Sequence, residues 1–132
     1  MKVKLNSIKE VPTLQLRSVG IDRQRVDAMV EFVKEGGVLP PITLVGDERY
    51  LADGHHRLAA AVRMGADTIE SNIEKGGLLE ATGYALRGND STSHLPLKTA
   101  ERNRGIAQLL DGGWTQGRIG DFTGPVSYTH LR

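Results

Sequence analysis

Short segments that contain apolar or β-branched residues, a composition that favours strands, recur through the first half of the chain. They cover residues 3–5, 42–45, 50–52 and 68–73. The segment 46–49 is rich in turn-forming residues, so the strands on either side of it are expected to pair as a hairpin. Pro12 opposes helix in the segment 11–20, which therefore reads as an extended connector.

A different spacing, with apolar residues every three or four positions, predicts helices between these runs. The first helix is expected to begin after Asp22 as N-cap and to stop at Gly36-Gly37. A second is expected over residues 55–64, with Leu58, Ala61 and Val62 facing the sheet. The sequence thus predicts an α/β (α+β) fold: a small mixed sheet with flanking helices.

The second half of the chain lacks strand patterns after residue 75. Helices are expected over residues 78–86, 99–110 and 114–122. In the middle one, Ile106, Leu109 and Leu110 are the expected apolar contacts. We therefore divide the chain into an α/β nucleotide-binding domain, residues 1–75, and a helical segment, residues 76–132.

The end of the helical segment matches the start of a helix-turn-helix. A short helix through Phe122 precedes a glycine-containing turn, and Ser127 is a candidate N-cap for a second helix. The alternative is two packing helices with a frayed terminus. Residues 126–132 resemble an adapter-like tail, so we expect the natural protein to be longer and to carry its groove-reading helix beyond Arg132.

Composition narrows the functional classes. The 132 residues include no cysteine, which excludes disulfides, thiolate zinc sites and thiol mechanisms. The net charge of +1 gives no bulk basic field, so nucleic-acid binding would need local patches. The sequence shows no secretory signal and no run near the ~20 apolar residues that span a bilayer. We expect a cytoplasmic protein with no membrane partner.

The segment Asp53-Gly54-His55-His56-Arg57 is the strongest chemical signal. A strand meets a glycine turn, and the next helix opens with two imidazoles and a guanidinium. Cations at a helix N-terminus oppose the helix dipole, so their presence favours a bound anion, above all a phosphate. In the alternative, Asp53 only caps the helix and the other side chains are solvated.

Other polar residues have weaker signals. His55 and His56 are adjacent and lack metal-ligand spacing, so no metal site is predicted, although a nucleotide could bring Mg²⁺. Gln15 and Arg17, in the connector, are candidates for the same anion pocket. Basic residues in the helical segment are candidate DNA-phosphate contacts or simply a solvated face. These are Lys98, Arg102 and Arg118, together with Arg104.

The segment from Leu51 to Ala61, preceded by Pro40-Pro41-Ile42-Thr43-Leu44 and an amphipathic helix ending in two glycines, resembles the ParB/sulfiredoxin superfamily. The resemblance is closest to ParB-like N-terminal domains of a group that reads Asp-Gly-Phe/His-His-Arg, and it runs from about residue 14 to 127. It implies a nucleotide-responsive, DNA-associated protein of the partition type that works as a homodimer.

In ParB proteins the corresponding turn reads Gly-Glu-Arg-Arg and binds the triphosphate of CTP. The resemblance carries this role to Gly54 and Arg57, with His55 and His56 in place of Glu and Arg as added donors that strengthen toward acid pH. It also implies that Asn89 and His94 close the pocket from the helical segment. The Glu that helps to hold Mg²⁺ is replaced by Gly88, which puts CTP hydrolysis in doubt.

Two sister branches share the fold. Sulfiredoxins need a cysteine in the phosphate turn, so the absence of cysteine excludes their activity. Free-serine kinases share Asp-Gly-His-His-Arg but use a Glu base where Gln15 stands, and an amide cannot accept the proton. Asp22 or Glu31 would have to substitute. A module that only binds other proteins is the remaining alternative.

Overall fold

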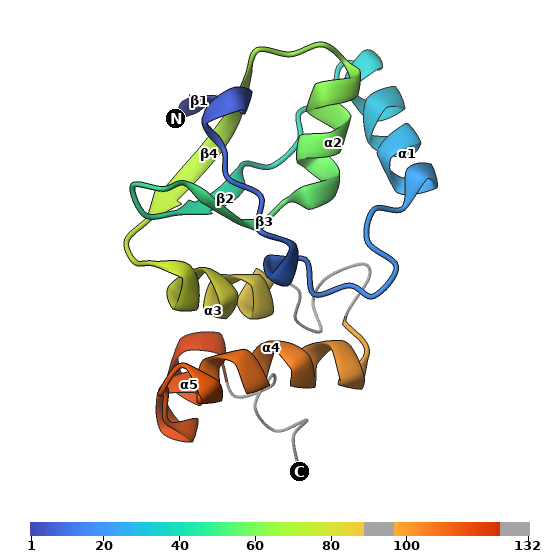
Figure 1. Cartoon of the computed structure of the whole chain (residues 1–132). Coiled ribbons are helices and arrows are strands. Elements are labelled where there is room, and N and C mark those ends of the chain that lie inside the picture. The colour runs from blue at the N-terminus through green and yellow to red at the C-terminus, as the bar shows by residue number, and fades with distance from the viewer. Residues whose placement is uncertain (89–96, 125–132) are drawn as a thin grey trace.

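The structure is a computed structural model that describes residues 1–88 and 97–124 (Figure 1). Its strands are β1 Lys2–Lys4, β2 Ile42–Val45, β3 Tyr50–Asp53 and β4 Thr68–Glu74. Its helices are α1 Arg23–Lys34, α2 His55–Arg63, α3 Leu78–Gly88, α4 Thr99–Asp111 and α5 Gln116–Thr123. Short 3-10 turns cover Leu5–Ser7 and Pro12–Leu14. The strands and helices expected from the apolar spacing are confirmed.

The four strands form one mixed sheet in the order β1-β4-β2-β3. β2 and β3 are the antiparallel hairpin that the turn residues predict, and β1 pairs antiparallel with β4. β2 and β4 run parallel, joined through α2. The predicted mixed α/β (α+β) sheet is therefore confirmed.

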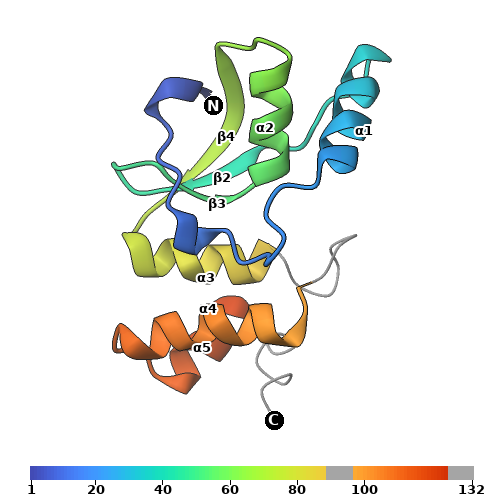
Figure 2. The same ribbon diagram turned by 45° about the vertical axis from the view of Figure 1, so that its right-hand side comes forward.

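Helices cover both faces of this sheet (Figures 1 and 2). Leu44 and Leu51 join the cluster that packs on Leu58 of α2, whereas Val45 and Ala52 pack with Ala81 of α3. Successive residues of a strand point to opposite faces, so a strand covered on both sides has to be apolar throughout. This explains why β2 and β3 read as continuous apolar runs.

The buried face of α2 differs from the expected one at one position. Leu58 and Ala61 are buried as predicted, but Val62 is 62% exposed, so its placement toward the sheet is wrong. α2 packs against α1 as well as against the sheet, and Ala60 is buried against Val26 of α1. This second contact rotates the buried stripe, so that Val62 lies on the outer side.

α3, α4 and α5 share a second core, built around Leu86, Ile106, Leu109, Trp114 and Ile119. Leu110, expected among the apolar contacts, is 43% exposed, because the buried stripe of α4 follows Ile106 and Leu109. No helix in the described ranges has the length and apolar character to cross a bilayer.

The cores cross the boundary placed at residue 75. Leu16, from the connector, is buried in the helical core, and Ala81 of α3 belongs to the core of the sheet. The N-terminal unit therefore depends on α3 for cover of one sheet face.

We call residues 14–22 the strap, because hydrogen bonds hold it to helices at both ends. Arg104 of α4 donates to the carbonyl of Leu16. The buried carboxylate of Glu101 accepts the N–H of Ser18 at 2.6 Å and that of Lys98, the N-cap of α4, at 2.9 Å. Burial raises the pKa of the Glu101 carboxyl, but these N–H groups outweigh it and hold the pKa below its ordinary value.

Candidate anion-binding site

The turn from β3 into α2 needs glycine for two reasons. Gly54 has φ +111°, a conformation that side chains disfavour. A Cβ there would also lie 2.4 Å from Cγ2 of Ile42. The glycine thus lets the start of α2 sit directly on β2.

The first turn of α2 presents backbone N–H groups with no cap. Gly54 is the N-cap residue and offers no side chain, and the structure shows no side-chain hydrogen bond at this cap. The first backbone bond of the helix runs from the N–H of Leu58 to the carbonyl of Gly54. The N–H groups that precede it concentrate positive potential at the helix start, which is where anions bind.

A pocket opens at this helix start between the strap, α1 and α2. Gln15, Arg17, Arg25 and Met29 line it, with Asp53-Gly54-His55-His56-Arg57 and Gly88. The structure therefore brings the whole predicted turn together with Gln15 and Arg17. It also adds Arg25, which the sequence analysis missed because an arginine in the first turn of an exposed amphipathic helix resembles a solvated charge.

Charge in this pocket is predominantly positive. Among the described residues that line it, three are arginines and Asp53 is the one carboxylate. Burial, with Arg25 close by, lowers the pKa of the Arg17 guanidinium. Gln15 turns its side-chain oxygen to the N–H of Arg17 at 3.1 Å, which fixes the backbone from which Arg17 extends. A multiply charged anion would relieve the repulsion among these cations.

Arg57 makes contacts within the protein that the sequence does not predict. Its Nη1 donates to the carbonyls of Pro40, at 3.0 Å, and Pro41, and its Nη2 lies 3.2 Å from Oδ2 of Asp53. The guanidinium is only 15% exposed. It lines the pocket, but most of its donors already bind the protein, so Arg57 is first a structural tie between α2 and the segment before β2.

The two histidines also separate in role. Nε2 of His56 accepts the backbone N–H of Asp22 at 2.9 Å, so the prediction that this side chain donates to a ligand is wrong at that nitrogen. Nε2 of His55 is buried and has no hydrogen-bond partner within residues 1–88 and 97–124, and the side chain lines the pocket. A buried polar atom left unpaired is costly, and a ligand in the pocket would satisfy it.

The expected strengthening of these histidines near pH 6.5 does not fit the site. Burial, opposed in part by Asp53, lowers the pKa of His55 to about 4. Burial and the nearby Arg25 also lower the pKa of His56. Both imidazoles are therefore neutral at pH 7, and His55 remains so well into the acid range.

An apolar groove adjoins the polar pocket. The two share Arg25, Met29, Asp53 and Arg57. The groove extends along Ala28, Phe32, Leu39 and Pro40, between α1 and the segment that leads into β2. A ligand with an anionic end and a less polar end would find a matching surface for each.

Four further residues are candidates for the site from the sequence. Asn89 and His94 fall outside the described residues. Asp22 caps α1 through the N–H of Gln24 at 3.0 Å, and the exposed Glu31 pairs with Lys34 at 3.8 Å. Neither carboxylate lines the polar pocket, so neither Asp22 nor Glu31 stands where it could replace the missing kinase base.

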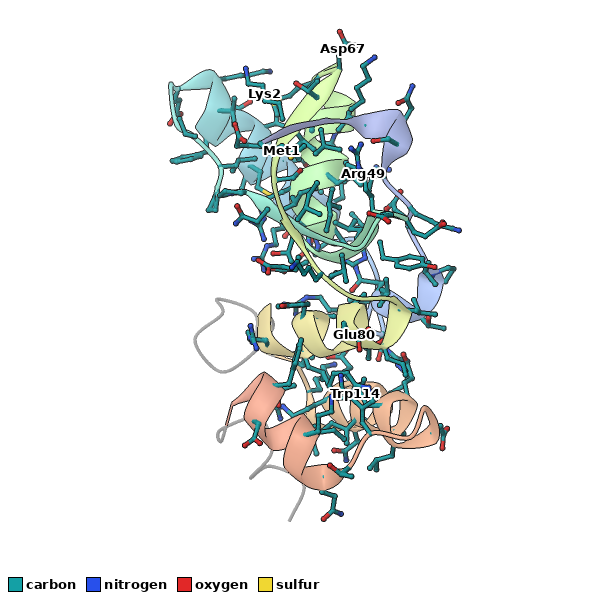
Figure 3. The ribbon with its side chains drawn as sticks, turned by 90° about the vertical axis from the view of Figure 1, so that its left-hand side faces the viewer. Met1, Lys2, Arg49, Asp67, Glu80 and Trp114 are labelled. Atoms are coloured by element: carbon teal, nitrogen blue, oxygen red, sulfur yellow. The ribbon has the colours of Figure 1, made fainter. Side chains whose placement is uncertain are left out.

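The candidate DNA contacts in the helical segment differ in exposure. Lys98 is exposed at the start of α4, but Arg102 is only 5% exposed, so its predicted role as a phosphate contact is wrong for this conformation. Arg118 of α5 stacks 3.9 Å from the ring centroid of Trp114 and pairs with Glu80 at 3.2 Å. Figure 3 shows Glu80 on α3 above Trp114. The side chain of Arg118 remains 54% exposed.

The described residues contain no group of three or more His, Cys, Asp or Glu side chains that could hold a metal ion. The second helix of the expected helix-turn-helix would follow Ser127 and lies outside the described residues, so that motif stays a prediction.

Comparison with known proteins gives one family and several relatives. The model of the ParB N-terminal domain matches residues 1–89. The chain is 30% identical to the "Streptomycin biosynthesis operon possible regulatory protein" of Streptomyces griseus, over 93% of this chain and 36% of that protein. It is 28% identical to the "Transcriptional regulator NovG" of Streptomyces niveus, over 97% of this chain and 39% of that protein.

The chain thus spans little more than a third of the length of these curated relatives. Among solved structures, sulfiredoxin from Arabidopsis thaliana matches with a TM-score of 0.49 and 28% identity, over 58% of this chain and 84% of that one.

Proposed function

This chain belongs to the ParB N-terminal domain family, and from that membership we propose that it is the nucleotide-sensing part of a DNA-associated regulator. The nucleotide that we propose is a triphosphate. CTP is the first candidate, because the turn at residues 53–57 resembles the phosphate-binding turn of ParB proteins. The role at the pocket is binding rather than turnover.

The observation that carries the proposal is the uncapped first turn of α2 inside a ring of arginines. Backbone N–H groups, Arg17, Arg25 and the unpaired Nε2 of His55 converge on one small pocket. Phosphate oxygens are acceptors with a full negative charge, and these donors would satisfy them without water. An uncharged ligand would not offset the positive charge that these side chains bring together.

The adjoining groove supports a nucleotide rather than a free phosphate. Met29 and Arg25 belong to both the pocket and the groove, so a phosphate chain bound at α2 would lead its nucleoside toward Leu39 and Pro40. Any Mg²⁺ would be held chiefly by the phosphates themselves, as is usual for this ion.

The names of the relatives support a role in transcription. One is named a possible regulatory protein of an antibiotic biosynthesis operon and the other a transcriptional regulator. We therefore favour control of transcription over a partition role, with DNA as the macromolecular partner and Lys98 and Arg118 as contacts. A homodimer would match a two-fold DNA site.

The direct test is nucleotide binding by calorimetry and thermal shift, with CTP, ATP, ADP and GTP, each with Mg²⁺. Arg25→Ala should weaken CTP binding about tenfold, because it removes a charge-assisted contact. Arg23→Ala is the matched control: Arg23 stands in the same turn of α1 but is exposed and does not line the pocket. CTP affinity should be unchanged in that variant.

Two outcomes would overturn the proposal. Binding of ATP or ADP in place of CTP, with phosphate transfer to free serine, would indicate the small-molecule kinase. No response to any nucleotide would indicate a module that binds proteins only. In the first case Asp53 would have to be the base, although it is the ion-pair partner of Arg57.

A further inference from the structure

His56 is a buried histidine whose hydrogen bond fixes its protonation state. It is 7% exposed and accepts the backbone N–H of Asp22 through Nε2. A backbone N–H can only donate, so Nε2 must carry the lone pair. The ring is therefore neutral, with its proton on Nδ1.

This bond joins the two helix starts that border the pocket. Asp22 is the N-cap of α1 and holds the N–H of Gln24 at 3.0 Å. Arg25 follows in the same turn of α1 and lines the pocket. His56 itself stands in the first turn of α2, whose N–H groups face the same pocket. The side chain thus sets where the start of α1, with Arg25, lies relative to α2.

We propose that His56 is a positioning residue for the anion pocket, which holds Arg25 in place only while its ring is neutral and releases the start of α1 when protonated. The effect on ligand affinity rests on the proposed function, whereas the effect on the position of α1 does not. Acid would therefore weaken ligand binding, whereas a histidine that donated to phosphate would strengthen it.

The charged groups around His56 also favour release of the start of α1 when the ring is protonated. Arg25 of α1 and Arg17 of the strap face it with positive charge, Asp22 faces it with negative charge, and His55 is its neighbour on α2. A protonated ring would lose its bond to Asp22 N–H and would meet two guanidinium groups. The lost hydrogen bond and the added repulsion both favour movement of the start of α1 away from α2.

A second tie limits the movement. Arg63, at the end of α2, forms an ion pair with Asp27 of α1. That pair involves no histidine and lies beyond the pocket lining. Protonation of His56 should therefore open only the N-terminal end of α1, without separating the two helices.

The first experiment needs no ligand. In the full chain, ¹⁵N NMR of the imidazoles should show His56 in the Nδ1–H form at pH 7, and the protection of the Asp22 amide, relative to an unstructured amide at the same pH, should fall on acidification. His56→Gln places an amide oxygen near the Nε2 position and cannot be protonated, so the protection of this amide should persist at acid pH. An Nε2–H tautomer of His56 at pH 7 would overturn the proposal.

The second experiment measures the affinity for CTP with Mg²⁺, and for tripolyphosphate, between pH 7.5 and 5.0. The ratio of the wild-type dissociation constant to that of His56→Gln should rise about tenfold as the pH falls. Taking this ratio removes the effect of protonation of the ligand, which is the same for both proteins. His56→Ala should bind about fivefold more weakly at every pH. Asp27→Asn, which removes only the other tie, should follow the wild-type profile.

The two experiments separate this inference from the proposed function. If neither anion binds at any pH, the proposed function fails, while the NMR result still decides whether His56 holds Asp22. If the anions bind and the dissociation constants of wild type and His56→Gln change in parallel with pH, His56 is not a pH-sensitive positioning residue and the inference fails.

Discussion

The backbone of Gly88, at the end of α3, packs directly against the carboxylate of Asp53, at the end of β3. A Cβ at position 88 would lie 2.7 Å from both Cγ and Oδ2 of Asp53. The same Oδ2 is the atom that pairs with Arg57 at 3.2 Å. The glycine is thus needed here for the Asp53–Arg57 pair to fit.

Gly88→Ala should therefore destabilise the protein by about 1–3 kcal/mol, because the added methyl group displaces the carboxylate of Asp53. Urea denaturation measures this change. Gly117→Ala in α5 is the control, since the nearest atom to its Cβ would be 4.0 Å away and alanine favours helix. Equal losses in the two variants would show that close packing at Gly88 is unimportant.

Arg57→Ala should destabilise the fold by about 2–4 kcal/mol, because it leaves Asp53 and the carbonyls of Pro40 and Pro41 without their donor. Arg57→Lys should recover only part of this loss, since one ammonium group cannot reproduce the forked geometry. Unfolding free energies of both variants test this. A fully stable Arg57→Ala would instead mark Arg57 as a ligand-binding residue alone.

The two ends of α2 offer a matched pair of glycines. Gly54→Ala should cost about 2–5 kcal/mol, because a strained φ of +111° is combined with a clash against Ile42. Gly65→Ala, at φ +72° with open space around its Cβ, should cost about 1 kcal/mol. Thermal denaturation compares them, and the difference isolates the clash. A smaller loss at Gly54 than at Gly65 would contradict the packing described.

Acid should destabilise the protein through its buried histidines. The pKa of His55 falls from 6.5 to about 4 on folding, so the unfolded chain takes up the proton first. This stabilisation is complete above pH 6.5 and is lost as the pH falls through about 4. The pKa of His56 is also lowered and acts in the same sense.

The measurement is the unfolding free energy from pH 7.5 to 4.5. A double variant, His55→Gln with His56→Gln, should flatten the dependence between pH 6.5 and 5, where few carboxylates titrate. A wild-type protein whose stability rises on acidification over that range would contradict the burial of both rings.

DNA binding should depend on the exposed basic residues of the helical segment. Lys98→Ala and Arg118→Ala should each weaken binding to a duplex and reduce the slope of log affinity against log salt by about 1. Fluorescence anisotropy at several salt concentrations measures both. Lys34→Ala, exposed on α1, is the control and should leave the slope unchanged. Unchanged slopes in all three variants would place the DNA interface elsewhere.

The elements could be predicted from the sequence because their apolar spacing is regular and their ends carry local signals. Asp22 caps α1 and Gly54 forms the entry to α2, as local chemistry indicates. The convergence of Gln15 and Arg17 on the turn followed from where the connector had to pass.

The hydrogen-bond partners could not be predicted, because they come from distant parts of the chain. His56 accepts from a residue 34 positions away, and Arg57 reaches carbonyls 16 and 17 positions away. Such partners decide whether a side chain is available to a ligand or instead holds neighbouring backbone segments in place. The burial of Arg102 and the role of Arg25 depend in the same way on how the helices pack.

The strap carries one side chain into each of two cores: Leu14 packs beneath the sheet, and two residues later Leu16 enters the core of α3, α4 and α5. Division of the chain at the linker before α3 would therefore give two fragments, each with an exposed apolar surface. A transfer of the N-terminal domain onto another scaffold would need to include α3 and α4.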